Sequence, residues 1–513
     1  MATERTQTDR RFLADLARGG FAESLSPAQR RAIHIETPLD EYLENALDDG
    51  KQVVLTGNPG DGKTQHILMC QDSYPEEDHF YLPDASEYAD YEDLLEKWED
   101  AYDSGTPGIL AINDGPLYRM TTEFREEYDF LPTVERQLEN QIIYSEDELP
   151  QIDFEQITVI DLNNRNVLTH SIISRAVRRF SKDFALDGHD HAGTCHIQYN
   201  AQKLQQKSIR ENLIDLLHTV GHYGEHVTVR DLINFLCYTV TGGEGECQTD
   251  YDEDLHYYNL AFTGNGLVFD LLRRQFESPD LVHPFIDSQL WARAEDEVAL
   301  GDADDAEGVV YPQFLRAKRQ FLFEDEAMDL GYESRKLFQS IEYEFLNHRN
   351  RGTDQGDQEQ FIRLLNGYFR PDNPRRSELD LWLSHRFRSK SSLALVSRTS
   401  VGKSDLVIRH PKLHPEIDDA INYSKTHTAL EYDHEGPPVR LRINTDLFRT
   451  LSALDASVPY TLRDREEEQQ ILEFMEEVEY YETYSSERGT ISVKDTDTGQ
   501  IETLDVNDTI YQS

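Results

Sequence analysis

The stretch Gln52–Thr64, QVVLTGNPGDGKT, decides the fold of this 513-residue chain. Its first five residues, 52–56, form a short apolar run of the kind that makes a buried parallel strand. The next eight, 57–64, follow the pattern G-x-x-x-x-G-K-T, and a helical pattern continues to Cys70. Glycines let the backbone N–H groups of such a loop turn inward around an anion, and the following helix adds a favourable dipole. The stretch therefore predicts a strand, a phosphate-binding loop and a helix.

The side chains of this loop predict a site for ATP and Mg²⁺. The Lys63 amine would neutralise the β- and γ-phosphates, and the Thr64 hydroxyl would reach Mg²⁺. We expect the nucleotide to contact Gly57, Asn58, Pro59, Gly60, Asp61, Gly62, Lys63, Thr64 and Gln65. The chain is therefore predicted to be a P-loop nucleoside triphosphatase, an enzyme that hydrolyses ATP.

Three further apolar runs follow, at residues 79–82, 108–112 and 157–160, with room for a helix between them. This repeated strand–helix pattern is typical of a parallel sheet wrapped by helices. Before the first strand, Thr37 and Pro38 begin an amphipathic helix that Gly50 ends. The core is therefore predicted to be an α/β P-loop fold of the AAA+ (ASCE-like) type.

A chain of this length is too long for one hydrophobic core, so we expect several domains. The predicted order is a helical lead-in, the ATPase core, a helical lid, a helical domain and a small α+β domain. Their ranges are 1–35, 36–200, 201–245, 246–385 and 386–513. The acidic, glycine-containing stretch 242–258 is interpreted as a linker.

ATP hydrolysis also needs a carboxylate at the end of a neighbouring strand, to hold Mg²⁺ through water and to orient the attacking water. Two strands end in one. ILAIND, residues 109–114, ends in Asp114, and ITVID, residues 157–161, ends in Asp161.

The strand order resembles that of AAA+ ATPases, in which the third strand carries the catalytic acid and the fourth a polar sensor. The resemblance makes Asp114 the catalytic and Mg²⁺-associated carboxylate. It gives the γ-phosphate sensor to Asn163 or Asn164, with Arg165 nearby. Asn113 departs from the pattern, because an aspartate that holds the metal is usual there, and this puts fast turnover in doubt. The alternative makes Asp161 the metal carboxylate.

Arginines could complete the site. Thr228 is a suitable N-cap for an apolar helix, and Arg230 in its first turn could reach the phosphates as a second sensor. The alternative is an exposed arginine paired with Asp231 at the helix start. In an oligomer of this chain, an arginine acting on a neighbouring copy could come from Arg175, Arg178 or Arg179, and the sequence does not select among them.

Two other patterns imitate functional motifs. His189, His191, Cys195 and His196 carry zinc-ligand side chains, but their spacing matches no standard zinc site, so we expect no structural zinc there. Residues 400–404, SVGKS, imitate the end of a phosphate-binding loop. Because Ser397 stands where the first glycine belongs, we interpret them as a chance match.

The charge is extreme: 98 Asp and Glu oppose 50 Lys and Arg, which gives a formal net charge of −48. The acids are spread along the whole chain, which indicates a halophile's solvated surface rather than an acidic partner-binding tail. In concentrated salt such a charge does not exclude a local DNA-binding face. The four cysteines show no paired C-x-x-C spacing, which indicates a reducing compartment. No apolar stretch is long enough for a membrane span. We therefore expect a cytoplasmic protein without a membrane partner.

The blocks at residues 33–68, 109–117, 159–165 and 195–204 resemble the DptF-type ATPases of DNA phosphorothioation-dependent restriction systems. The resemblance covers about residues 30 to 245. It implies an ATP-using component of an antiviral defence system that acts with other restriction proteins and contacts DNA directly or through them. The resemblance implies functional roles for Gly57, Gly62, Lys63, Thr64, Asp114 and Asn163. No nuclease constellation is evident in the C-terminal half.

Three functions remain open at this point. The first is a motor or switch that couples ATP hydrolysis to DNA restriction. The second is a slow nucleotide switch that serves as an interaction platform, which Asn113 favours. The third is another AAA+-like, DNA-associated ATPase that assembles into a ring or filament.

Overall fold

The computed structural model describes most of the chain. The described residues are 10–19, 25–85, 88, 91–145, 147–183, 195–222, 224–246, 248, 250–277, 284–299, 310–328, 330–331, 334, 355–370, 375–386, 393–455, 465–482, 490–495 and 500–505. Backbone proximity divides the chain into two compact units. The first comprises 1–143, 148–338 and 413–424, and the second comprises 144–147, 339–412 and 425–513.

The first unit contains a four-stranded parallel sheet, as predicted. Its strands are β1 (Gln52–Thr56), β2 (Phe80–Leu82), β3 (Gly108–Ala111) and β5 (Ile157–Asp161), in the order β2-β3-β1-β5. The central strand β1 is buried along its whole length and pairs with β3 on one side and β5 on the other. Because all strands run the same way, the carboxyl ends of β1, β3 and β5 meet at one edge.

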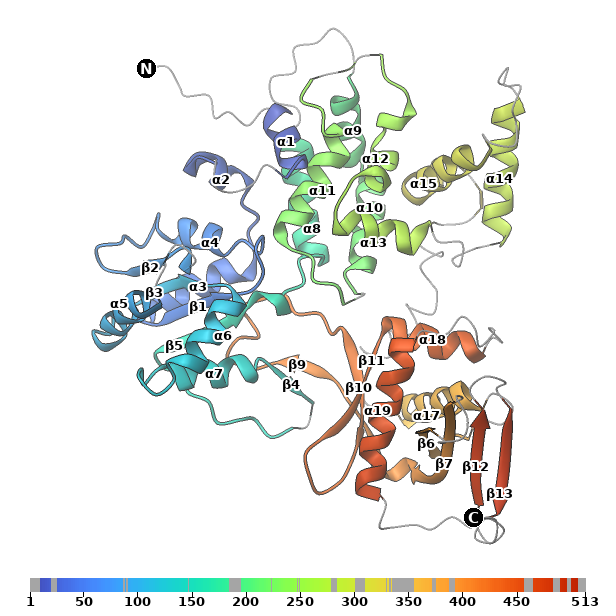
Figure 1. Cartoon of the computed structure of the whole chain (residues 1–513). Helices are drawn as coiled ribbons and strands as arrows, with labels where there is room; N and C mark the ends of the chain where they lie inside the picture. The colour runs from blue at the N-terminus through green and yellow to red at the C-terminus, as the bar shows by residue number, and fades with distance from the viewer. Residues whose placement is uncertain are drawn as a thin grey trace, which may run out of the picture. The chain divides into compact units, whose positions relative to one another are not determined.

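Helices cover both faces of this sheet (Figure 1). They are α3 (Pro38–Asp48), α4 (Lys63–Cys70), α5 (Tyr91–Asp103), α6 (Asp114–Glu123) and α7 (Leu131–Glu139). Val53 and Leu55 pack in a cluster with α3 and α4, whereas Val54 packs in a second cluster with α5, α6 and α7. The alternation of side chains along β1 thus produces a three-layer arrangement.

The predicted helix before the first strand is confirmed as α3. Thr37 is its N-cap, and Asp40 closes a capping box by accepting the Thr37 backbone N–H at 2.7 Å. Gly50 has φ +78° just after the helix, a conformation in which a residue with a Cβ is strained.

The rest of the first unit is helical. It contains α1 (Arg10–Ala17), α2 (Pro27–Ile33), α8 (His170–Arg178) with a π-helical turn at 179–183, α9 (His196–Gln205), α10 (Lys207–Val220), α11 (Val229–Thr241), α12 (Tyr257–Thr263), α13 (Leu267–Phe276), α14 (Pro284–Ala299) and α15 (Val310–Met328). The predicted helical content of 201–243 is confirmed. One apolar core joins α8 to α13, so packed structure runs across the predicted domain boundary at 245, and Tyr257 and Tyr258 at the end of the predicted linker are buried in it.

The second unit is α+β. Its elements are α17 (Gln355–Phe369), β6 (Glu378–Arg386), β7 (Leu393–Gly402), β8 (Leu406–Arg409), β10 (His427–Tyr432), β11 (Val439–Asn444), α18 (Thr445–Asp455), α19 (Arg465–Glu482), β12 (Thr490–Asp495) and β13 (Ile501–Asp505). They form the sheets β13-β12-β7-β6 and β11-β10-β8. Short strands β4 (Ile142–Tyr144) and β9 (Pro411–Leu413) lie where the chain passes from one unit to the other.

The strands predicted at 439–443 and 490–493 are confirmed as parts of β11 and β12. The predicted helical pattern up to 385 extends too far, because residues 378–386 form β6 instead. Leu379, Leu381 and Leu383 occupy every second position and are buried, which is the period of a strand. The five predicted domains are finer than the two units and stay predictions. Among the described helices, none combines the length and the apolar character that a bilayer crossing requires.

Gly108 tests the sheet. A Cβ at this position would lie 2.1 Å from the Phe80 carbonyl oxygen of β2, so Gly108→Ala must push β2 and β3 apart. We expect a loss of about 2–4 kcal/mol in the free energy of unfolding, measured by denaturant titration. In the control Gly115→Ala, in the first turn of α6, a Cβ meets no atom within 4 Å. The control should be neutral or slightly stabilising, and equal effects at the two positions would contradict the packing argument.

Candidate nucleotide-binding site

The glycine loop leaves the carboxyl end of β1 and enters α4. Gly57, Gly60 and Gly62 have φ values of +131°, +109° and +85°, which residues with a Cβ rarely adopt. At Gly57 a Cβ would also lie 2.8 Å from the Asp61 carboxylate. The glycines are therefore needed both for the backbone path and for the space inside the loop.

Lys63, the first residue of α4, turns its amine back into the loop. Nζ donates to the carbonyl oxygens of Gly57 at 2.6 Å and Asn58 at 3.0 Å. Burial lowers the pKa of Lys63, while the carboxylates of Asp61 and Asp114 act in the opposite direction. The amine thus lies at the centre of the loop, held only by backbone oxygens that an anion could replace.

Asp61 is fully buried and holds the loop to its surroundings. Its carboxylate accepts the Asn58 backbone N–H at 2.7 Å and lies 2.8 Å from Nε2 of His226. His226 lies three residues before α11, and the backbone N–H of Arg230 in that helix donates to the Gly60 carbonyl at 3.2 Å. The start of α11 therefore rests directly on the loop.

The N-cap prediction at Thr228 is confirmed. Its hydroxyl accepts the Asp231 backbone N–H, and the Asp231 carboxylate accepts the Thr228 N–H at 3.0 Å. Asp231 thus caps the helix. The structure places Arg230 over Gly60, with 3.2 Å from its Cβ to the position a Gly60 Cβ would take.

Asp114 joins the carboxyl ends of three strands. It is the first residue of α6, directly after β3, and its carboxylate accepts hydrogen bonds from the Thr56 hydroxyl of β1 and from the side-chain amide of Asn163 beyond β5. Asn163 comes from the 3-10 turn Leu162–Asn164. The two residues that the sequence predicts as acid and sensor are thus direct hydrogen-bond partners, and Asn113 is the half-buried N-cap of α6.

Asp161 lies at the end of β5 and is half-buried. Its carboxylate accepts the Asn163 backbone N–H at 2.9 Å and the Asn164 amide at 3.4 Å. Burial raises its pKa from 3.8 to about 6, and the charges of Asp114 and Asp61 act in the same direction. Burial therefore disfavours the ionised form of Asp161 at this edge of the sheet.

Arg165 connects the glycine loop to α4, and the sequence analysis gave it no specific role. Its guanidinium is buried, donates to the Asp61 carbonyl, and lies 3.3 Å from Nε2 of His66 on α4. Because arginine only donates, His66 Nε2 accepts and its Nδ1–H donates to Asp40 at 2.8 Å. Burial lowers the pKa of His66, which favours this neutral form. A chain of hydrogen bonds thus joins the loop to the start of α3.

His34 completes this cluster, with Nε2 at 3.0 Å from the Asp40 carboxylate. Burial alone would raise the pKa of Asp40, but the two imidazoles outweigh it and hold the pKa below its ordinary value. The ligand atoms of His34, Asp40 and His66 lie within 4.8 Å of one another, close enough for a metal ion. A metal on His66 Nδ1 would move the ring proton to Nε2, against the Arg165 donor, so the geometry fits the hydrogen-bonded form better. The capping-box pattern could have placed Asp40 at the start of α3, but no local signal places it beside His66.

Several predicted residues have other contacts. Gln65 donates from its side chain to the Arg30 carbonyl at 2.9 Å, and the Thr64 hydroxyl donates to the Pro83 carbonyl at 3.0 Å. The candidate trans-acting arginines differ: Arg175 and Arg179 bind the carbonyls of Glu36 and Ala32, whereas Arg178 is exposed in the last turn of α8.

The structure describes residues of both patterns that imitate functional motifs, the His/Cys cluster at 189–196 and SVGKS at 400–404. Cys195 is the buried N-cap of α9, and His196 is buried with its nitrogens at the Thr241 carbonyl and the Gln248 backbone N–H; His189 and His191 lie outside the described residues. In SVGKS, Ser400 and Gly402 belong to β7, and the Lys403 amine binds Glu359 at 2.5 Å.

Comparison with known proteins adds no relative: no family model, curated protein or solved structure matches the chain.

The raised pKa of Asp161 gives a prediction for stability. Above pH 6 the folded chain holds an ionised carboxylate that burial disfavours by about 3 kcal/mol, and this penalty disappears as the pH falls toward the ordinary value. Asp161→Asn removes the charge. We expect it to stabilise the nucleotide-free chain by up to about 3 kcal/mol at pH 8 and by about 1 kcal/mol at pH 4.5, in denaturant titrations at the two pH values. A gain that does not change with pH would show that ionisation of Asp161 is not the cause.

Proposed function

We propose that this chain is a P-loop ATPase of the AAA+ type that acts in DNA restriction. The observation that carries the ATPase proposal is the position of the Lys63 amine, inside a loop of three positive-φ glycines between a buried parallel strand and a helix. Such loops bind the phosphates of nucleoside triphosphates through backbone N–H groups and one lysine.

The residues of the site fit ATP and Mg²⁺. The Lys63 amine would exchange the carbonyls of Gly57 and Asn58 for phosphate oxygens, and the N-terminus of α4 would face the same anion. The Thr64 hydroxyl donates to Pro83, so its lone pairs are available to a cation. Bound Mg²⁺ would neutralise charge that develops on the phosphates during hydrolysis.

Asp114 is the group best placed to orient the attacking water. Its carboxylate is exposed at the sheet edge and is fixed by Thr56 and Asn163. Asp161 is held by its own turn and has a raised pKa, which makes it the weaker choice for a group that must be ionised. Asn163, held against Asp114, could report the presence of the γ-phosphate to the catalytic acid.

The restriction role comes from the resemblance to DptF-type ATPases. In this proposal, ATP turnover in the first unit is coupled to DNA and to other restriction proteins. A second candidate is a slow nucleotide switch that works as an interaction platform. Asn113 favours this candidate, because an amide at the N-cap of α6 offers Mg²⁺ no negative charge.

Lys63→Ala tests the site. We expect ATP hydrolysis by the purified protein, in molar KCl with Mg²⁺, to fall to background, because the Lys63 amine is the charge that would neutralise the β- and γ-phosphates. The control Lys207→Ala removes an amine whose side chain is 81% exposed on α10 and should keep the wild-type rate. A several-fold increase of the Lys63-dependent rate by duplex DNA would favour the motor, whereas ATP binding without turnover would favour the switch. Normal hydrolysis by Lys63→Ala would refute the site.

Asp114→Asn separates the two carboxylates. The amide keeps the size of the side chain but cannot accept a proton, so we expect ATP binding to be retained and hydrolysis to fall about 100-fold or more. Asp161→Asn should have a much smaller effect on the rate. Fluorescent-nucleotide binding and steady-state phosphate release measure both quantities. An unchanged rate in Asp114→Asn, with a loss in Asp161→Asn, would transfer the role to Asp161.

A further inference from the structure

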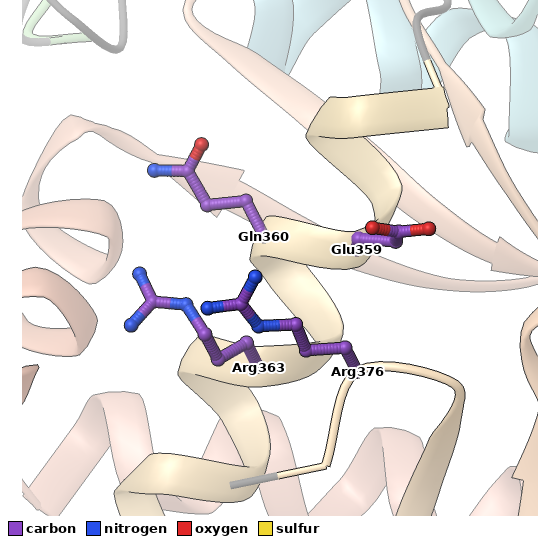
Figure 2. Close-up of a pocket in the computed structure, with 4 residues that line it drawn as sticks. All are labelled: Glu359, Gln360, Arg363 and Arg376. Atoms are coloured by element: carbon purple, nitrogen blue, oxygen red, sulfur yellow. The ribbon is translucent and has the colours of Figure 1, made fainter.

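A polar cavity of about 440 Å³ opens on the second unit, far in sequence from the glycine loop. Its described lining residues are Glu359, Gln360 and Arg363 of α17 and Arg376, which lies two residues before β6. In Figure 2 the side chains of Gln360, Arg363 and Arg376 extend toward the same side of the view, and all three line the cavity. The Glu359 carboxylate lies apart from them in this view (Figure 2), although the charge of Arg376 acts on it.

The cavity is locally basic in an acidic chain. The whole chain has 98 acids for 50 bases, yet residues 359–376 contain four arginines and two acids. Among the described residues of the lining the carboxylate is that of Glu359, which accepts from the Lys403 amine at 2.5 Å, and this hydrogen bond lowers the pKa of Glu359. Lys403 thus compensates the charge that would otherwise oppose an anion.

A neighbouring arginine shows the contrast. Arg375 lies 3.1 Å from the Glu378 carboxylate and 3.7 Å from that of Asp380, so its charge is used within the second unit. Arg376 lines the cavity, as Arg363 does, and its charge also acts on the Glu359 carboxylate. An anion in the cavity would be attracted by both guanidinium charges.

The lining indicates the class of anion. Guanidinium groups match the oxygens of a phosphate group in bidentate pairs, and the Gln360 amide can add a neutral donor. Pockets for small organic ligands are mostly apolar, and single-stranded bases require aromatic stacking surfaces. The four described residues that line this cavity are polar or charged. The cavity therefore suits a phosphate group whose attached nucleoside stays outside.

We propose that Arg363 and Arg376 form a binding site for a backbone phosphate of duplex DNA. Such a contact positions a protein on DNA without reading the sequence. The choice of DNA as the source of the phosphate rests on the proposed function, whereas the phosphate chemistry rests on the cavity itself. The site gives the second unit a direct role in DNA binding.

The test uses the full-length protein, a short labelled DNA duplex and no nucleotide, so that its result does not depend on the ATP site. Fluorescence anisotropy is measured over a series of KCl concentrations for wild type and for Arg363→Gln/Arg376→Gln. We expect the double variant to bind about tenfold more weakly or worse. The steepness of log K against log salt should also fall by about 1, because the contact with one phosphate is lost.

The matched control is Arg119→Gln/Arg293→Gln. These arginines are 61% and 44% exposed on α6 and α14 of the first unit, so the control makes the same change in net charge elsewhere. It should bind DNA within about twofold of wild type. Arg363→Lys/Arg376→Lys keeps the charge but loses the planar fork, and should give intermediate affinity with the wild-type salt slope. This variant also serves as the test if the glutamine variant does not fold.

Three outcomes would overturn the proposal. One is equal binding by the pocket variant and the charge-matched control, which would mean that only net charge matters. Another is a wild-type protein that binds no duplex at any salt concentration. The last is calorimetric binding of inorganic phosphate or AMP that depends on Arg363 and Arg376, without duplex binding, which would assign the site to a free phosphate ligand.

Discussion

The buried carboxylate of Asp61 is the group on which the candidate site depends. A buried carboxylate without partners costs several kcal/mol, and here the partners are the Asn58 N–H and the His226 ring. The carbonyl of the same residue accepts from Arg165. The loop, the turn after β5 and the start of α11 must therefore assemble together, and the loop's conformation is a property of the whole first unit rather than of eight residues.

Cations are scarce in this chain, and several of those in the first unit bind backbone carbonyls rather than surface acids. Lys63 binds carbonyls of the loop, Arg165 binds the Asp61 carbonyl, and Arg175 and Arg179 bind those of Glu36 and Ala32. Arg175 and Arg179 thus bind the segment before α3, which contributes His34 to the His34–Asp40–His66 cluster. A change at the loop could therefore reach this segment through Arg165 and His66, which are packed elements with defined hydrogen-bond partners.

The edge of the sheet concentrates the groups that would control hydrolysis. Thr56, Asp114 and Asn163 come from three strands and meet in one hydrogen-bonded set, while Asp161 stays in its own turn. This arrangement supports one acid fixed between a hydroxyl and an amide. In the proposed ATPase, the rate of turnover would depend on how well a site with Asn113 holds Mg²⁺, and this is the physical difference between the motor and the switch.

The sequence by itself determined the local features. Glycine spacing, apolar runs and capping residues act over a few positions, so they predicted the loop, the four parallel strands, the start of α3 at Thr37 and the N-cap at Thr228. A helical interpretation failed at 378–386, where β6 alternates with the period of a strand. Only the tertiary structure decided which polar groups meet: Asp61 with His226, Arg165 with His66, and Asp114 with Asn163. These partners lie 165, 99 and 49 residues apart, so no local pattern encodes their contact, and it arises because strand ends converge and buried polar groups must find partners.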